Sequence, residues 1–317
     1  MIRKTAAFFI LLGLFPCLPG QEKVSNEEFN FYKKLNDQES RLSDYKDSDN
    51  DLMLKLIQLQ VINDSRKNHR ASPVKLDILA SRVANMACLE AAEGDYVSHW
   101  NRRGETPYHR YAFAGGYDHI SENVAGESFT GSYEQSDRTR LELMKKYHDM
   151  FMAERAPNDG HKLNIIEKSH NYVGIGLFLG ENVFRYNEEF IDRYYEFIDV
   201  PDQVKAGKEF IITLQTKEGY YLCYIVAYWE KELRSMTNSY LRQTGGYPDY
   251  TDKTALEIGP RAVSKFREAN RYIIKMNFPR PGLYYIQIYQ DDKDHSQSSS
   301  FSSKGKIQAS GIVIRVV

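Results

Sequence analysis

Apolar residues recur at helical spacing over three stretches in the first half of the chain, and each stretch predicts an amphipathic helix. The first covers residues 51–69, with Leu52, Leu56, Leu59 and Ile62 on one face. The second follows Pro73, has an apolar face that runs from Leu76 to Ala91, and stops at Gly94. The third has its apolar face at Leu141, Met144, His148 and Phe151. Glu154 follows Phe151 by three residues, so it lies on the same side.

Outside these helices the pattern predicts loops and strands. Residues 95–132 are punctuated by glycine and are predicted as loops. Residues 172–179 and 183–186 predict two strands joined by a turn. Beyond Pro201 the helical periodicity stops, and five strand-like runs follow, at residues 210–214, 220–226, 272–276, 283–289 and 311–316. Short strands with loops between them favour a β-sandwich, and residues 291–304 are predicted as a surface loop.

These patterns predict an α+β protein of about two domains, a number that suits 317 residues. Residues 51–200 form the first predicted domain and are expected to fold without the rest, because their helices and strands complete one core. Residues 201–317 form the second, an all-β domain with an immunoglobulin-like sandwich. Residues 21–50 are polar and charged, and we expect a mobile leader with one short helix near residues 27–35.

The first twenty residues have the pattern of a signal peptide. Arg3 and Lys4 precede an apolar run at residues 6–15 that is too short to span a bilayer, and cleavage is predicted after Gly20. A secreted or periplasmic protein without a transmembrane span is the first interpretation. A lipoprotein anchored through Cys17 is the alternative, although a proline directly before that cysteine argues against it.

Charge and cysteine content narrow the class of protein. The net charge is −1, so no overall field draws the chain to nucleic acid or to an anionic membrane. After cleavage only Cys88 and Cys223 remain, in different predicted domains, and we expect both to be buried free thiols. An exported protein without disulfides is more typical of bacteria than of animals or plants.

Two histidines and two glutamates, each in a distinctive local setting, are the strongest candidates for chemistry. They are His99, Glu122, Glu154 and His161. Imidazoles and carboxylates that converge in one cleft can bind a divalent metal or pass protons. The other histidines are expected to be packed or solvated residues without a role in a site: His69, His109, His119, His148, His170 and His295.

The order of motifs around these four residues resembles the CAP superfamily, the SCP-domain proteins that include cysteine-rich secretory, antigen 5 and pathogenesis-related proteins, in its bacterial form. The matching segments are residues 62–66 (an Asn-x-x-Arg run), 96–101 (the His-bearing loop), 121–125 (Gly-Glu-Asn, with Ser for Gly), 160–165 and 173–176. The resemblance covers residues 52 to 200, nearly half of the chain. Phe151 departs from the pattern, because the family usually has Trp there, and this weakens the match at Glu154.

The resemblance implies an α-β-α sandwich and a cleft in which His99, Glu122, Glu154 and His161 meet. Two neutral imidazoles would be the first metal ligands, with carboxylates or water completing the shell. Zinc is the first candidate because it favours nitrogen ligands, ahead of calcium or magnesium. Two structural readings stay open: Glu122 holding loop amides, and Glu154 ending a helix.

Three functions remain as hypotheses. The first is a secreted, non-catalytic module that binds a divalent metal and a lipid or other small ligand, or contacts a host or cell-envelope surface, as the resemblance implies. The second is a metal-dependent, peptidase-like hydrolase that uses the same four residues. The third is an adhesive scaffold that acts through the β domain. No clear nucleophile is predicted, because neither Ser98 nor Ser121 lies in a nucleophile-elbow pattern.

Overall fold

A computed structural model of the chain describes residues 24–244, 246–247 and 253–317. The predicted signal peptide, including Cys17 and the cleavage point after Gly20, lies outside the described residues. The described part contains both helices and sheets, as the α+β class predicts. Within that part, no helix combines the length and the apolar character needed to cross a membrane.

A four-stranded sheet forms the centre of the N-terminal half. Its strands are, in spatial order, β1 (Lys75–Leu76), β3 (Tyr172–Leu179), β4 (Val183–Asp192) and β2 (His119–Ser128). β4 is antiparallel to both β3 and β2, and β1 runs parallel to β3. β2 is therefore an edge strand, and it carries one of the candidate residues, Glu122, paired directly opposite Glu189 of β4.

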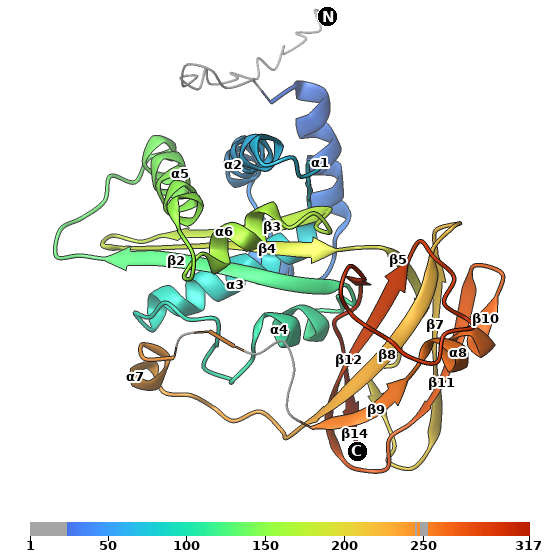
Figure 1. Ribbon diagram of the computed structural model, residues 1–317. Coiled ribbons are helices and arrows are strands. Elements are labelled where there is room, and N and C mark those ends of the chain that lie inside the picture. Colours follow the sequence, from blue (N-terminus) through green and yellow to red (C-terminus); the bar gives the residue numbers. More distant parts are fainter. Residues whose placement is uncertain (1–23, 245, 248–252) are drawn as a thin grey trace, which may run out of the picture.

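Helices cover both faces of this sheet, which makes three layers (Figure 1). One face carries α2 (Asp49–Asn68), α5 (Asp137–Ala153) and α6 (Gly160–Ile166), with α1 (Asn26–Gln38) packed on α2. The other face carries α3 (Ile78–Glu93) and α4 (Pro107–Phe113). The α-β-α arrangement that the resemblance implied is present, and the three helices predicted from periodicity are α2, α3 and α5.

Two glycines let α3 lie unusually close to the sheet. A Cβ atom on Gly174 would stand 2.4 Å from the backbone carbon of Ala80, and one on Gly176 would stand 2.4 Å from that of Ala84. No side chain fits into that space. Both glycines lie inside β3, so the close approach of the strand to α3 depends on their lacking a side chain.

The segment before α2 is bound to the domain and differs from the mobile leader that its polar sequence predicts. It contains α1 and a short 3₁₀ helix, Ser43–Tyr45. The fully buried guanidinium of Arg82 on α3 donates to the carbonyl oxygens of Asn36, Glu39 and Arg41. Lys55 and Asp47 form a buried ion pair at 2.7 Å. The segment is rich in polar residues because it binds the buried charged groups of Arg82 and Lys55. Composition alone does not reveal these contacts.

Residues 95–132, predicted as loops, contain α4 and β2. α4 has only seven residues, too few to establish a period, although most of its side chains are buried. β2 buries Glu122 and Asn123 as well as Ile120, so its burial does not follow an alternation of apolar and polar residues. Periodicity could not predict α4 because the helix is too short, and it could not predict β2 because the strand buries polar residues.

The C-terminal half contains two further sheets around one hydrophobic cluster. The first has, in spatial order, β10 (Arg267–Glu268), β11 (Arg271–Asn277), β7 (Glu209–Thr216) and β5 (Tyr195–Asp199). The second has β6 (Gln203–Val204), β14 (Ile312–Val316), β12 (Gly282–Asp291), β8 (Tyr221–Glu230) and β9 (Thr254–Ile258), and β13 (Ile307–Gln308) also pairs with β12. Two short helices lie in the connections, α7 (Asn238–Leu241) and α8 (Pro260–Val263), and a 3₁₀ helix, Ser264–Phe266, follows α8. Because β5 pairs with β7, the second unit begins before Pro201.

The two halves share a third hydrophobic cluster, which α4 and the six-stranded sheet both enter. The rings of Tyr108 and Tyr285 stack at 4.1 Å between centroids. The carboxylate of Glu230 on β8 accepts a hydrogen bond from Tyr108 and bonds the imidazole of His109, each at 2.7 Å. The N-terminal half therefore meets the C-terminal half through buried apolar and polar contacts.

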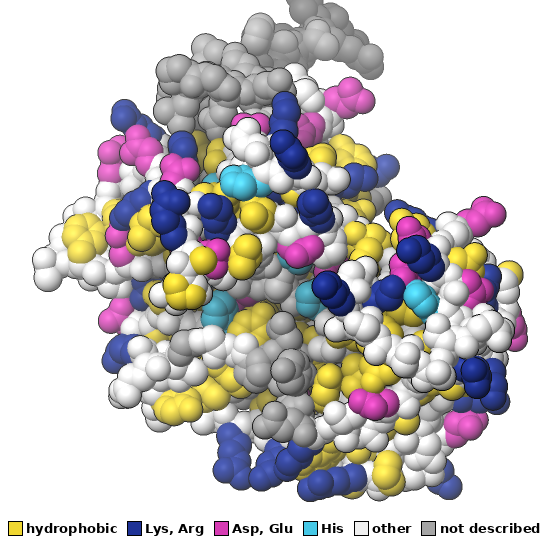
Figure 2. Space-filling view, viewed as in Figure 1, with side chains coloured by type: hydrophobic (Ala, Val, Ile, Leu, Met, Phe, Trp, Pro, Cys, Tyr) yellow, Lys and Arg dark blue, Asp and Glu magenta, His cyan; other side chains and the backbone are white. Residues whose placement is uncertain are grey.

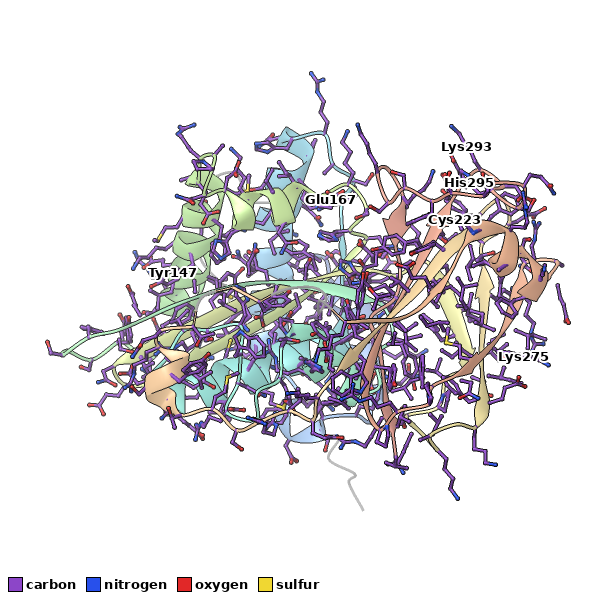
Figure 3. The ribbon with its side chains drawn as sticks, turned by 60° about the horizontal axis from the view of Figure 1, so that its bottom comes forward. Tyr147, Glu167, Cys223, Lys275, Lys293 and His295 are labelled. Carbon is purple, nitrogen blue, oxygen red and sulfur yellow. The ribbon has the colours of Figure 1, made fainter. Side chains whose placement is uncertain are left out.

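Both cysteines within the described residues are buried free thiols, as predicted. Cys88 lies on α3, and Cys223 lies on β8, where Figure 3 labels it. Burial raises the pKa of the Cys88 thiol and raises that of Cys223 to about 12, so neither is a ready nucleophile or metal ligand at neutral pH.

Candidate functional site

His99 and Glu122 form the first half of the candidate site. His99 lies in the loop after α3, and its Nδ1 is 2.9 Å from Glu122 Oε1. The other oxygen of Glu122 accepts from Asn187 at 2.9 Å and from the guanidinium of Arg110. Three side chains thus engage both oxygens of a carboxylate that has no exposed surface. Glu122 engages these side chains, where the structural reading had expected loop amides.

Burial and charge set the protonation of the acids in this half. Burial raises the pKa of Glu122, but the charge of Arg110 and the hydrogen bond from His99 more than offset it, and the pKa falls to about 2. Glu189, buried directly opposite, has a pKa raised well above its usual range by burial and by the negative charge of Glu122. Glu122 is therefore the acid of the pair that ionises first, and Glu189 the one that holds its proton more strongly.

Glu154 and His161 form the second half. Glu154 Oε1 lies 2.5 Å from His161 Nδ1. Its Oε2 accepts from the backbone amides of His161 at 3.0 Å and Lys162 at 3.4 Å. Glu154 directly follows the last residue of α5, and His161 is the second residue of α6, so the carboxylate holds the start of the next helix together with the imidazole. The ring of Phe151 stacks on that of His161 at 4.5 Å between centroids.

The edge strand β2 connects the two halves. Glu122 points to the face of the sheet that α3 and α4 cover, where it meets Arg110. The next residue, Asn123, points to the opposite face and donates from Nδ2 to the carbonyl oxygen of His161 at 3.2 Å. The four predicted residues therefore form two His–Glu pairs. Glu122 of β2 belongs to the first pair, and the next residue, Asn123, contacts the second.

Pairing with a carboxylate does not by itself mark a site in this chain. Seven of the eight histidines pair with a carboxylate, and His69 is the exception. His148 and His170 are buried, and each uses both ring nitrogens within the domain. His99 and His161 differ, because no hydrogen bond from the described residues reaches Nε2 of either ring. With Nδ1–H donating to a glutamate, that Nε2 presents a lone pair.

A small pocket lies beside the His99–Glu122 pair, between α3, the His99 loop and β2. Its lining residues are Ala87, Ala91, Tyr96, Val97, Ser98, Trp100, Asn101, Arg110, Val124, Ala125, Arg185 and Asn187. Two buried donors on these residues, Trp100 Nε1 and Arg110 Nε, have no hydrogen-bond partner among the described residues. Unpaired buried donors favour a ligand that brings an acceptor oxygen.

The serines that flank the predicted residues both serve local structure. Ser98 Oγ accepts from the amide of Trp100 and donates to the carbonyl oxygen of Thr244. Ser121 Oγ donates to Asn164 Oδ1 at 2.6 Å. His170 Nε2 lies 3.0 Å from that same Asn164 oxygen, while its Nδ1 faces Asp192. His170 Nε2 also lies 3.3 Å from Ser121 Oγ, a longer contact than the 2.6 Å hydrogen bond that this hydroxyl donates to Asn164.

Three residues that contact the predicted set were not found from sequence. They are Arg110, Asn187 and Glu189. Arg110 reaches Glu122 from α4, and the other two reach it because β4 pairs with β2. Arg110 had a signal, because it follows the His-bearing loop at a spacing typical of the superfamily. No local pattern distinguishes Glu189 from its neighbour Glu188, which points to the opposite face and bonds His148.

No protein-family model matches the chain, and a comparison with curated proteins finds no match. Among solved structures, the chain is similar to an extracellular protein containing an SCP domain from Bacillus anthracis, at 18% identity and a TM-score of 0.33. That match covers 43% of this chain and 39% of the Bacillus chain. An outer surface protein from Borrelia burgdorferi matches at 17% identity and a TM-score of 0.35, over 44% of this chain and 92% of that one.

The CAP domain of enterococcal PrgA is also similar, at 16% identity and a TM-score of 0.29, over 42% of this chain and 58% of that one. The superfamily that the sequence resembles is therefore also the one named for the Bacillus and enterococcal structures. The chain spans well under half of the Bacillus protein and just over half of the enterococcal domain structure.

Proposed function

We propose that residues 51–200, with the helix that precedes them, form the CAP domain of an exported bacterial protein that binds a divalent ion, zinc first, through His99 and His161. The observation that carries this proposal is the state of the two imidazoles. Each is bonded at Nδ1 to a glutamate and has Nε2 without a partner among the described residues. A carboxylate behind a histidine is the usual arrangement around metal-binding imidazoles, because it fixes the tautomer and raises the basicity of the ring.

The glutamates act as orienting groups in this proposal. Glu122 is fully buried and already engages His99, Arg110 and Asn187. Glu154 is partly exposed but holds His161 and the first amides of α6. Within the described residues, no cluster of three or more His, Cys, Asp or Glu side chains has a geometry that could hold a metal. Water would therefore complete a shell begun by two imidazoles, and a bound zinc would supply a Lewis acid there.

The pocket beside His99 has room for about one water molecule, so what fits it is a single acceptor oxygen of a ligand. The unpaired donors of Trp100 and Arg110 support that ligand class over a purely apolar one. A lipid belongs to this class of ligand only if its head group carries the acceptor oxygen. Secretion or export to the periplasm is part of the same proposal, with the lipoprotein anchored at Cys17 as the alternative, and an immunoglobulin-like sandwich is proposed for residues 201–317.

No observation favours the hydrolase. Both serines beside the predicted residues are engaged in local hydrogen bonds, and the buried thiols have raised pKa values. No observation supports the adhesive-scaffold hypothesis either. The β half packs closely against the first domain. A binding module is the function that these contacts support best.

The test is a zinc titration by calorimetry on the full chain and on His99→Ala, His161→Ala and His69→Ala. His69 is the matched control, because it is exposed and pairs with no carboxylate. We expect zinc binding in the parent and in the control, and loss of it in both site variants. Equal binding in all four proteins would overturn the proposal. The same proteins, assayed for peptide hydrolysis, separate the binding module from the hydrolase.

A further inference from the structure

The connection between β8 and β9 leaves the C-terminal sheets and crosses the N-terminal domain. We call its described residues 231–244 and 246–247 the strap. Figure 1 shows that α7, which belongs to the strap, lies beneath α3, far from the strands on either side of it in sequence. A connection that only joins two paired strands of one sheet has no need to travel so far.

Specific contacts bind the strap to the N-terminal domain. The amide of Met236 donates to the carbonyl oxygen of Arg102 at 2.8 Å. The guanidinium of Arg242 donates to the carbonyl oxygens of Asp95 at 2.7 Å and Gly94 at 3.1 Å. Leu241 is fully buried, in a cluster with Ala91 and Tyr96 of the first domain.

The backbone of the strap also fits closely against the His99 loop. A Cβ atom on Gly104 would stand 2.4 Å from the carbonyl oxygen of Arg234, and Gly104 has a φ of +76° that side-chain-bearing residues rarely adopt. Two features of one glycine therefore suit it to the place where the strap passes. Both ends of the loop that carries His99 contact the strap.

Within the described part of the strap, Tyr247 lies beside the imidazole of the first His–Glu pair. The ring of Tyr247 lies 5.1 Å from that of His99 between centroids. Ser98, the residue before His99, donates from Oγ to the carbonyl oxygen of Thr244. The His99 side chain keeps 15% of its surface exposed, against 33% for His161, on which Phe151 of the same domain stacks.

We propose that Tyr247 is a specificity-determining residue of the His99 site, supplied by the C-terminal half and held in place by the strap. The aromatic ring narrows the approach to His99, so that ions and slender ligands reach the imidazole and bulky groups do not. This deepens the proposed function by naming what controls access to the site. The shielding itself rests on the strap contacts and does not require that metal binds.

The test measures the accessibility of each imidazole without any metal. The full chain is treated with diethyl pyrocarbonate at a fixed neutral pH in the presence of a chelator, and modification of His99 and His161 is followed by peptide mass spectrometry. The variants are Tyr247→Ala, which removes the ring, and Arg242→Ala, which removes an anchor. Tyr240→Ala is the matched control, because this strap tyrosine is 57% exposed.

We expect His99 to be modified several-fold faster in Tyr247→Ala and in Arg242→Ala than in the parent and in Tyr240→Ala. His161 is the internal reference and should keep its rate in all four proteins. An unchanged ratio of the His99 rate to the His161 rate would overturn the proposal. An equal rise at both histidines would report general loosening of the domain and would overturn it too. A faster His99 in a chain that fails to bind zinc would retain the strap proposal and reject the metal.

Discussion

Glu122 and Glu189 lie directly opposite each other on β2 and β4, both fully buried, with the guanidinium of Arg110 near both carboxyl groups. Arg110 forms an ion pair with Glu122 and lies 3.7 Å from Glu189 Oε1. One buried cation cannot neutralise two buried anions, so one of the acids keeps its proton. Glu122 has the closer contact and the lowered pKa, which leaves Glu189 as the neutral member.

Removal of the buried cation should cost far more stability than removal of the neutral acid. Arg110→Gln leaves the carboxylate of Glu122 buried without its ion pair, and we expect a loss of about 3–5 kcal/mol in the free energy of unfolding. Glu189→Gln keeps the shape and loses no charge, and should be at least as stable as the parent at pH 7. Urea denaturation at pH 7 measures both values. Equal losses in the two variants would mean that Glu189 is ionised.

The same pair predicts a pH dependence whose sign can be worked out. The folded chain keeps the Glu189 proton above pH 4.5, where the unfolded chain releases it. The folded state then binds more protons, so the stability contribution of Glu189 is lost as pH rises, by up to about 1.4 kcal/mol per pH unit. Parent and Glu189→Gln should therefore diverge in favour of the variant between pH 5 and 8. A constant difference over that range would contradict a raised pKa.

Glu122 contributes in the opposite direction. Its folded pKa of about 2 lies below the ordinary value of 4.5, so its stabilisation is complete above that value and is lost as pH falls toward 2. Replacement by Gln removes this acid-sensitive part and strands the charge of Arg110. We expect Glu122→Gln to be least stable relative to the parent near pH 7, and to approach it in acid. Denaturation at pH 3 and pH 7 measures the trend, and a larger gap at pH 3 would show that the sign is wrong.

Glu154→Gln tests the orienting role proposed for the second glutamate. An amide keeps one oxygen for Nδ1 of His161 but removes the charge that raises ring basicity. We expect zinc affinity to fall by about 10–100-fold, the usual effect of losing such a partner. Glu142→Gln on α5 is the control, since that residue forms only an exposed ion pair with Arg138. Calorimetry on both variants measures the zinc affinity. An unchanged affinity in Glu154→Gln would show that Glu154 does not orient His161 for metal binding.

A truncation tests how much of the chain the first core needs. Residues 48–202 include the predicted domain but lack the segment whose carbonyl groups hold Arg82. An unpaired buried charge is costly, so we expect this fragment to unfold with a broad transition and residues 24–202 to unfold more sharply. Circular dichroism melts compare them. A sharp transition in the shorter fragment would restore the original boundary and show that Arg82 finds other partners.

Sequence reasoning succeeded where the cause of structure is local. The spacing of Leu52, Leu56 and Leu59 predicted α2, and Gly94 ended α3 where expected. The motif order selected His99, Glu122, Glu154 and His161 as one set, and the structure shows that they form two pairs, His99 with Glu122 and His161 with Glu154. In each of these cases a few neighbouring residues determine the outcome, and periodicity or motif spacing reports them.

It failed where the cause is a contact between distant segments. Glu189 matters because a strand register places it opposite Glu122, and Tyr247 matters because a connection crosses to the other domain. Asn36 and Arg41 support α3 through backbone carbonyl groups, which carry no residue identity to recognise. Tertiary pairing of this kind has no signature in one sequence, so the contacts that bind residues 24–50 and the strap to the first domain could not be predicted.

Successive side chains of β2 point to opposite faces of the sheet, and this limits where insertions can occur in related sequences. Glu122 and Asn123 serve opposite faces of the sheet, so the two halves of the site depend on odd and even positions of one strand. Insertion of a single residue before Glu122 within β2 would send the carboxylate toward α6 and the amide toward Arg110. Homologues should therefore differ in length after Ser128, in the connection to α5, and keep the number of residues from His119 to Asn123 constant.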